Sequence, residues 1–258
     1  MRITVLLENT TDRSDMLTEH GLSLYIETDS SKILFDMGQS DFFARNAAVL
    51  GVDLSSVDLA VLSHGHYDHG GGLAHFLAVN DRACVYLQRE AFLPYYNGEG
   101  RYIGLDGVLA GTTRLRYVDE SYQIADGVAL FSCNQRPRKY TTGTFGLRLR
   151  QGTEDIPDPF RHEQYLLLQD GGRRVLISGC SHKGILDIVQ WFSPDVLVGG
   201  FHLSKMPTDA RLQAYASALS AYPTQYYTCH CTGEAQYHYM KEQMPNLHIL
   251  RCGDTVLV

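Results

Sequence analysis

Three histidines and one aspartate occur within six residues of the segment SHGHYDHGGG, residues 63–72. An apolar stretch precedes the segment and is predicted to be a β-strand. His64 and His66 are two residues apart, so in an extended chain their side chains point to the same side. Asp68 and His69 are followed by glycines, whose conformational freedom permits a tight turn. These residue types at this spacing predict a compact site for one or two divalent metal ions.

The alternative interpretation of this segment is a solvated histidine-rich turn. That interpretation explains neither the apolar strand before the segment nor the three glycines at its end. Imidazole and carboxylate ligands suit zinc, iron or manganese, and the residues alone do not choose among these ions.

Three further histidines end apolar segments in the second half of the chain. They are His182 in LISGCSHKG, His202 in LVGGFHL and His230 in YYTCHCTG. Strand ends are where α/β folds present chemical groups. A lone histidine there is more often a hydrogen-bonded polar residue than a ligand, but the segment at 63–72 shifts that balance. We expect His182 and His230 to be metal ligands, and His202 to be either a ligand, a donor to a ligand or a substrate contact.

Alternating strands and helices must bring these residues together. Strands are predicted at 3–8, 22–27, 32–38, 58–63, 83–88, 127–133, 144–150, 164–169, 173–180, 194–200, 224–230 and 247–258. Helices are predicted at 41–50, 73–79, 184–192, 208–221 and 234–244. Two strand-rich halves with helices outside predict an α/β fold, a four-layer αββα sandwich, as a single domain over residues 1–258. The glycine-containing loops at 94–116 and 134–144 are expected to border the site.

Composition narrows the classes of partner. The 258 residues are 44% hydrophobic, which is ample for a core. A net charge of -7 and a pI near 5.8 argue against general binding to nucleic acid or anionic membranes, and leave a small, anionic molecule open as the substrate. No apolar run approaches a membrane span and no signal peptide is visible, so we expect a cytoplasmic protein. Nothing in the sequence indicates an oligomeric state.

The HGHYDH run with its glycines, the LFDMG segment and the strand-end residues together resemble the metallo-β-lactamase superfamily over almost the whole chain. The segments ENTT, EHGLS, LFDMG, LSHGHYDHGGG, SGCSHKGI, GGFHL and CHCTG are similar to a subfamily labelled dihydropterin or ribofuranosyl-aminobenzene-phosphate synthase-like. This resemblance implies a centre of two divalent metal ions, for which we expect Zn²⁺, with Fe or Mn as alternatives. It implies that His64 and His66 bind the first ion, that Asp68 and His69 bind the second, and that His230 completes the second.

Three cysteines, Cys180, Cys229 and Cys231, lie within two residues of a candidate histidine ligand. Many superfamily members carry a bridging aspartate after a strand-end glycine, where this chain has Gly179 followed by Cys180. Cys180 is therefore either a thiolate ligand or a buried packing residue. The resemblance leaves a missing ligand of the first ion, and His182 is our substitute for it. Alternation along the strand across His230 lets at most one of the Cys229 and Cys231 thiols face the site, and no second CxC or CxxC pair completes a structural zinc site, so we interpret both as packing residues.

Four further features each have two possible roles. Asp36 either orients the ligand run or caps a turn. His20 precedes a strand and lies either at the pocket rim or on a surface loop. Lys183 and the basic segment 136–139 either contact a substrate phosphate or are solvated charges, the second being slightly favoured for the segment.

Hydrolysis follows as the predicted reaction. A metal-bound hydroxide would attack a small ester, lactone or phosphate-containing substrate, with Asp68 as the catalytic residue that orients the nucleophile and passes on its proton. The alternatives are a pterin- or aminobenzene-phosphate-related synthase, a di-iron redox protein and a binding protein with an inactive metal site.

Overall fold

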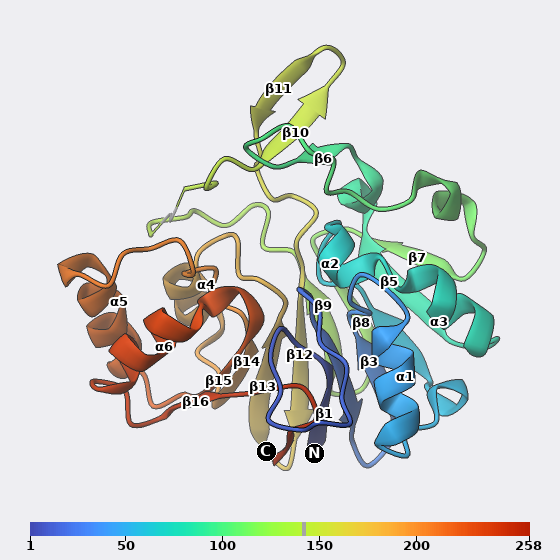
Figure 1. The fold of residues 1–258 in the computed structure, drawn as a ribbon, viewed down its shortest axis with the longest axis horizontal. Helices are drawn as coiled ribbons and strands as arrows, with labels where there is room; N and C mark the ends of the chain where they lie inside the picture. Colours follow the sequence, from blue (N-terminus) through green and yellow to red (C-terminus); the bar gives the residue numbers. More distant parts are fainter. Residues whose placement is uncertain (141–142) are drawn as a thin grey trace.

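The computed structural model describes residues 1–140 and 143–258, arranged around two seven-stranded sheets that face one another (Figure 1). The first sheet has the order β17-β1-β2-β3-β4-β5-β7. Its strands are β1 (Arg2–Leu7), β2 (Ser23–Glu27), β3 (Lys32–Phe35), β4 (Leu59–Val61), β5 (Cys84–Gln88), β7 (Leu115–Val118) and β17 (Thr255–Leu257).

The second sheet has the order β16-β15-β14-β13-β12-β9-β8. Its strands are β8 (Ser121–Ala125), β9 (Val128–Phe131), β12 (Tyr165–Asp170), β13 (Arg173–Ser178), β14 (Val196–Gly199), β15 (Gln225–Thr228) and β16 (Leu247–Ile249). The strands β13 to β16 are mutually parallel, so the residues that follow β13, β14 and β15 all emerge at the same edge.

Helices cover the outer face of each sheet. α1 (Phe42–Val49) and α3 (Leu73–Val79) pack on the first sheet, and α4 (Ile185–Phe192), α5 (Ala210–Ser220) and α6 (Glu234–Lys241) pack on the second (Figure 1). A separate apolar cluster fills the space between the sheets, with side chains such as Ile26, Val61, Ile177 and Val198 fully buried. The αββα sandwich is therefore confirmed. Among the described residues, no helix is long and apolar enough to cross a membrane.

A small third sheet stands above the edge at which the chemically interesting residues lie (Figure 1). It consists of β6 (Tyr95–Tyr96), β10 (Arg148–Gln151) and β11 (Glu154–Pro157). The sequence predicts a strand at 144–150, but only its end forms β10. The strands β6, β7, β8 and β11 were not predicted, because they are short and mostly polar or lie inside segments that look irregular.

The loop at 94–116 does border the site, as expected. The Tyr67 backbone amide donates to the carbonyl of Ile103, and the Tyr95 ring stacks on His162 with centroids 4.0 Å apart. The other predicted loop, 134–144, includes residues 141–142, which lie outside the described residues.

Candidate metal centre

The first group of donor atoms combines the end of β4 with the end of β13. His64, His66 and His182 are buried, and each offers a ligand atom within 4.8 Å of the others. The Nε2 atoms of His64 and His182 are 3.3 Å apart. His182 thus lies where the sequence analysis placed it, beside the histidine pair of the HGHYDH run.

The second group forms around α2 (Tyr67–Gly70), a short helix followed by Gly71, where a Cβ atom would lie 2.5 Å from the Gln39 carbonyl oxygen. The Nε2 atoms of His69 and His230 are 3.2 Å apart. The Asp68 carboxylate lies beside both rings, with Oδ2 3.4 Å from His230 Nε2 and 3.7 Å from His69 Nε2. His20 stands at the rim, with Nε2 3.3 Å from the same oxygen and its side chain 57% exposed.

Asp36 supports both groups from one buried position at the end of β3. Its Oδ2 accepts hydrogen bonds from His69 Nδ1 at 2.6 Å and from the Ser63 hydroxyl at 2.7 Å. Because the Ser63 hydroxyl proton is directed to Asp36, its oxygen accepts from His64 Nδ1 at 2.8 Å. One carboxylate therefore fixes the tautomer of two histidines, which agrees with the orienting interpretation of Asp36.

These hydrogen bonds test whether the residues fit a metal ion. His69 donates through Nδ1 to Asp36, and His230 donates through Nδ1 to the Asn9 side-chain oxygen at 2.9 Å. When both rings are neutral, both Nε2 atoms carry lone pairs that face each other at 3.2 Å, next to the Asp68 carboxylate. Such an arrangement is repulsive unless a proton or a metal ion lies between the rings, and two imidazoles with a carboxylate beside them are a donor set that fits a divalent metal ion.

The electrostatics of this group agree with that conclusion. Burial opposes charge on His69, yet Asp36 and Asp68 raise its pKa to about 9. Burial likewise opposes ionisation of Asp68, but His69 and His230 lower its pKa. For His64 and His182, burial and the neighbouring histidines lower the pKa. The second group thus favours positive charge, and the first group consists of neutral imidazoles suited to coordination.

Two buried carboxylates hold the second-half histidines by their backbone. Glu163 accepts hydrogen bonds from the backbone amides of His182 and Lys183, at 2.6 and 3.0 Å. Glu8 accepts from the backbone amide of His230 at 2.6 Å. Glu8 begins the ENTT segment, but no motif in the sequence indicates that Glu8 or Glu163 binds a backbone amide elsewhere in the chain.

Lys183 is not placed to contact a substrate, and that part of the phosphate hypothesis is wrong. Its side chain is buried, and Nζ donates to the carbonyl oxygens of Ser132 at 2.6 Å and Glu163 at 2.8 Å. In the basic segment, Arg136 donates to the carbonyl of Trp191 and Arg138 to that of Pro159. These guanidinium groups hold loops in place.

His162 and Asp158 form a third polar group that the sequence analysis missed. His162 Nδ1 accepts from the Gly65 amide at 2.8 Å, and its Nε2 donates to Asp158 Oδ2 at 3.1 Å. The same carboxylate oxygen lies 3.8 Å from His66 Nε2. Both residues come from the connection between β11 and β12, where no strand-end pattern identifies them. Since both nitrogens of His162 are engaged, it supports the run rather than offering a ligand atom.

Cys180 lies inside the centre, with Sγ 3.2 Å from His69 Nε2. Cys231 does not pack in the core as predicted, because its Sγ lies with Cys180 and His202 in one group of possible ligand atoms. Cys229 does pack in the core between the sheets. Burial raises the pKa of Cys180. Burial opposes ionisation of Cys231, but its neighbours Cys180 and His202 lower its pKa.

Strained backbone concentrates at these strand ends. Asp36, Ser181, His202 and His230 have φ between 50° and 60°, in the left-handed region that costs energy for residues with a side chain. Each stands beside or within one of the donor groups. Such strain at strand ends is typical of a functional site, where the surrounding fold enforces the geometry.

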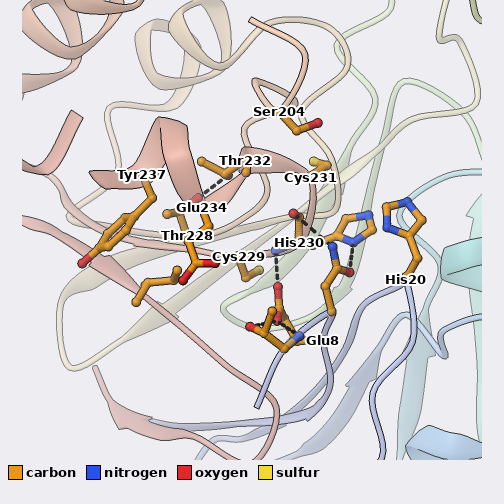
Figure 2. Close-up of a pocket in the computed structure, with 14 residues that line it drawn as sticks. Glu8, His20, Ser204, Thr228, Cys229, His230, Cys231, Thr232, Glu234 and Tyr237 are labelled. Atoms are coloured by element: carbon orange, nitrogen blue, oxygen red, sulfur yellow. Dashed lines mark hydrogen bonds between the residues drawn. The ribbon is translucent and has the colours of Figure 1, made fainter. Parts of the chain in front are cut away.

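A cavity of about 190 Å³ opens beside the second group (Figure 2). His20, His230 and Cys231 line one side of it, and Glu234 and Tyr237 line another. Figure 2 shows the His20 and His230 rings next to each other, and their centroids are 4.6 Å apart. The cavity gives solvent and small molecules a route to the second group.

Comparisons with known proteins agree with this architecture. Residues 18–216 match the sequence model of the metallo-beta-lactamase superfamily. The crystal structure of a metal-dependent hydrolase of the β-lactamase superfamily is 32% identical, with a TM-score of 0.83 over 100% of this chain and 99% of that one. An uncharacterized protein of Methanocaldococcus jannaschii is 30% identical over 241 residues, 90% of each chain. From the same organism, 7,8-dihydropterin-6-methyl-4-(beta-D-ribofuranosyl)-aminobenzene-5'-phosphate synthase is 24% identical, over 94% of this chain and 91% of that protein.

Proposed function

Since the chain belongs to the metallo-β-lactamase superfamily, we propose that it is a metal-dependent hydrolase of a small ester, lactone or phosphate-containing substrate. One observation carries the proposal. The Nε2 atoms of His69 and His230 face one another beside the Asp68 carboxylate, with their other nitrogens hydrogen-bonded away, so a proton or a metal ion must lie between them and the three groups supply a ligand set for the metal ion. The pair formed by His64 and His182 lies in the same buried site and supplies a second position.

We expect two Zn²⁺ ions. His64, His66 and His182 would bind one ion, and Asp68, His69 and His230 would bind the other. When bound, such ions lower the pKa of a coordinated water toward about 7 and polarise a carbonyl or phosphoryl oxygen of the substrate.

We assign to Asp68 the role of orienting the attacking water and transferring its proton. Its buried carboxylate is ionised at neutral pH, and Oδ2 points toward the rim, where His20 Nε2 lies 3.3 Å away. The carboxylate would orient the attacking water by accepting a hydrogen bond from it. His20 is partly exposed at the mouth and provides the next position from which a proton can reach a leaving group.

Substituting Asp68→Asn tests this proposal, because the amide keeps the shape and removes the charge. We expect metal content to fall and hydrolysis to drop by about 100-fold or more across a panel of esters, lactones and phosphodiesters. The exposed His75→Asn in α3 is the matched control and should behave like the parent protein. Parent-level hydrolysis by Asp68→Asn would remove Asp68 from the mechanism, and parent protein inactive on the whole panel despite bound metal would favour a binding protein.

A second candidate is a synthase acting on pterin- and aminobenzene-phosphate-like compounds. The observation that favours it is the 24% identical relative, whose match extends over 94% of this chain. Incubating the metal-loaded protein with a dihydropterin and an aminobenzene phosphate, and following product by mass spectrometry, separates the two candidates. Formation of a joined product without hydrolysis of the ester panel would favour the synthase.

A further inference from the structure

Cys180, His202 and Cys231 form a group of donors that the two histidine groups do not require. One ligand atom of each lies within 4.8 Å of the others. They come from three adjacent parallel strands, following β13, β14 and β15. Cys180 faces the histidine groups on one side and Cys231 on the other, so the group extends the centre toward the cavity of Figure 2.

The His202 ring is the observation that points to a ligand. Neither Nδ1 nor Nε2 has a hydrogen-bond partner among the described residues, although both atoms are buried. The backbone of His202 is in the left-handed region, with φ 52°, so the fold maintains a strained conformation to hold this ring beside His182, with ring centroids 4.2 Å apart. Buried nitrogens without a hydrogen-bond partner are unfavourable unless a bound ion or water molecule takes that place.

Space for the Cys231 sulfur is also built into the fold. A Cβ atom at Gly200 would lie 2.4 Å from Cys231 Sγ, so only glycine at that position leaves room for the sulfur. The backbone amide of His202 donates to Cys231 Sγ at 3.3 Å. The sulfur is thus held against the loop that carries His202, rather than packed among aliphatic side chains as Cys229 is.

We propose that Cys180, His202 and Cys231 form a third metal site, specific for a thiophilic divalent ion such as Zn²⁺, beside the dinuclear centre. Two thiolates and an imidazole are a ligand set that zinc prefers, with a fourth position open to water or a small ligand. Two thiolates also neutralise the charge of a divalent ion, which reduces the cost of burying it. Cys231 lines the cavity of Figure 2, which provides an entry path for the ion.

Cobalt substitution tests the site without any substrate, so its outcome is independent of the proposed hydrolysis. The full-length protein is stripped with a chelator under reducing conditions and reloaded with Co²⁺. Bound metal is measured by elemental analysis, and thiolate-to-cobalt charge transfer is measured by near-ultraviolet absorption. We expect Cys231→Ser and His202→Ala each to bind one ion fewer than the parent, and Cys231→Ser to lose about half of the thiolate absorption. Cys229→Ser, two residues away and packed in the core, should match the parent.

A second measurement uses the unaltered protein. Zn²⁺ should protect Cys231 from alkylation by iodoacetamide, detected by peptide mass spectrometry, and removal of zinc should expose it. The proposal is wrong if Cys231→Ser keeps the metal content and absorption of the parent while Cys180→Ser loses the absorption, because Cys180 then serves the dinuclear centre alone. Equal alkylation of Cys231 with and without zinc would also overturn it.

Discussion

The histidines from the first half of the chain, His64 and His69, and those from the second half, His182 and His230, are held in different ways. In the first half, the Asp36 carboxylate bonds imidazole directly at His69 and through the Ser63 hydroxyl at His64. In the second half, carboxylates bond the backbone: Glu163 holds the amide of His182, and Glu8 holds that of His230.

The difference follows from chain connectivity. The first-half histidines lie on one continuous turn, so Asp36 can bind the Ser63 backbone amide and support both ring tautomers from a single position. The second-half histidines follow separate parallel strands on strained turns, with φ 60° at Ser181 and 50° at His230. Buried carboxylates at those turns stabilise backbone conformations that would otherwise be unfavourable.

The largest effect should come from the shared carboxylate. Asp36→Asn keeps the shape and tolerates the left-handed backbone, where φ is 60°, but it presents an NH₂ group to His69 Nδ1 or to Ser63. Both tautomers should then change together. Loss of one such support typically costs about 10- to 100-fold in metal affinity or activity, so we expect at least about 100-fold in Zn²⁺ affinity, measured by competition with a chelating dye.

Asp58→Asn is the control for that experiment. Asp58 lies on the surface just before β4 begins, at the end of the strand away from the site, and pairs with Arg82. Its substitution should leave zinc affinity unchanged. If Asp36→Asn binds zinc as tightly as the parent, the tautomers are not set by Asp36 and the contrast between the halves fails.

The second prediction uses pH to examine the buried lysine beside Glu163. Burial lowers the pKa of Lys183 to about 8 from its usual value of 10.5. Below pH 8 both the folded and unfolded states carry the proton, and the folded state bears the full cost of a buried ammonium. Between pH 8 and 10.5 the unfolded state binds more protons, so the free energy of unfolding rises with pH, by on the order of 3 kcal/mol in total.

Lys183→Met isolates this effect, since other groups titrate in the same range. Urea unfolding of both proteins at several pH values should show the parent gaining stability relative to Lys183→Met as pH rises from 8 to 10.5. Parallel curves would mean that Lys183 is not a buried ammonium and that the support around Glu163 is more hydrated than its burial indicates.

Much of the fold and roughly the first half of the site could be predicted from the sequence. The αββα layers follow from the alternating apolar segments, and the HGHYDH run is local, so its geometry depends on few contacts. Glu8 and Glu163 could not be predicted, because each acts on a backbone amide 222 or 19 residues away. Cys231 was misassigned for a related reason: the turn at His230 leaves the extended conformation, with φ 50°, so alternation along the strand no longer says where the sulfur points.

The smallest effect should come from weakening one backbone support. Glu163→Gln keeps an oxygen acceptor but replaces the other with an NH₂ group, so only one of the His182 and Lys183 amides stays well paired. His182 should still reach the first donor group, because Phe160 stacks on its ring with centroids 4.6 Å apart. We expect about a tenfold loss of zinc affinity at one ion and little at the other. Glu120→Gln is the matched control, since Glu120 also accepts a backbone amide, that of Asn134, away from the candidate ligands. A loss at both ions as large as that of Asp36→Asn would show that the two halves are held by one connected network, rather than by separate side-chain and backbone supports.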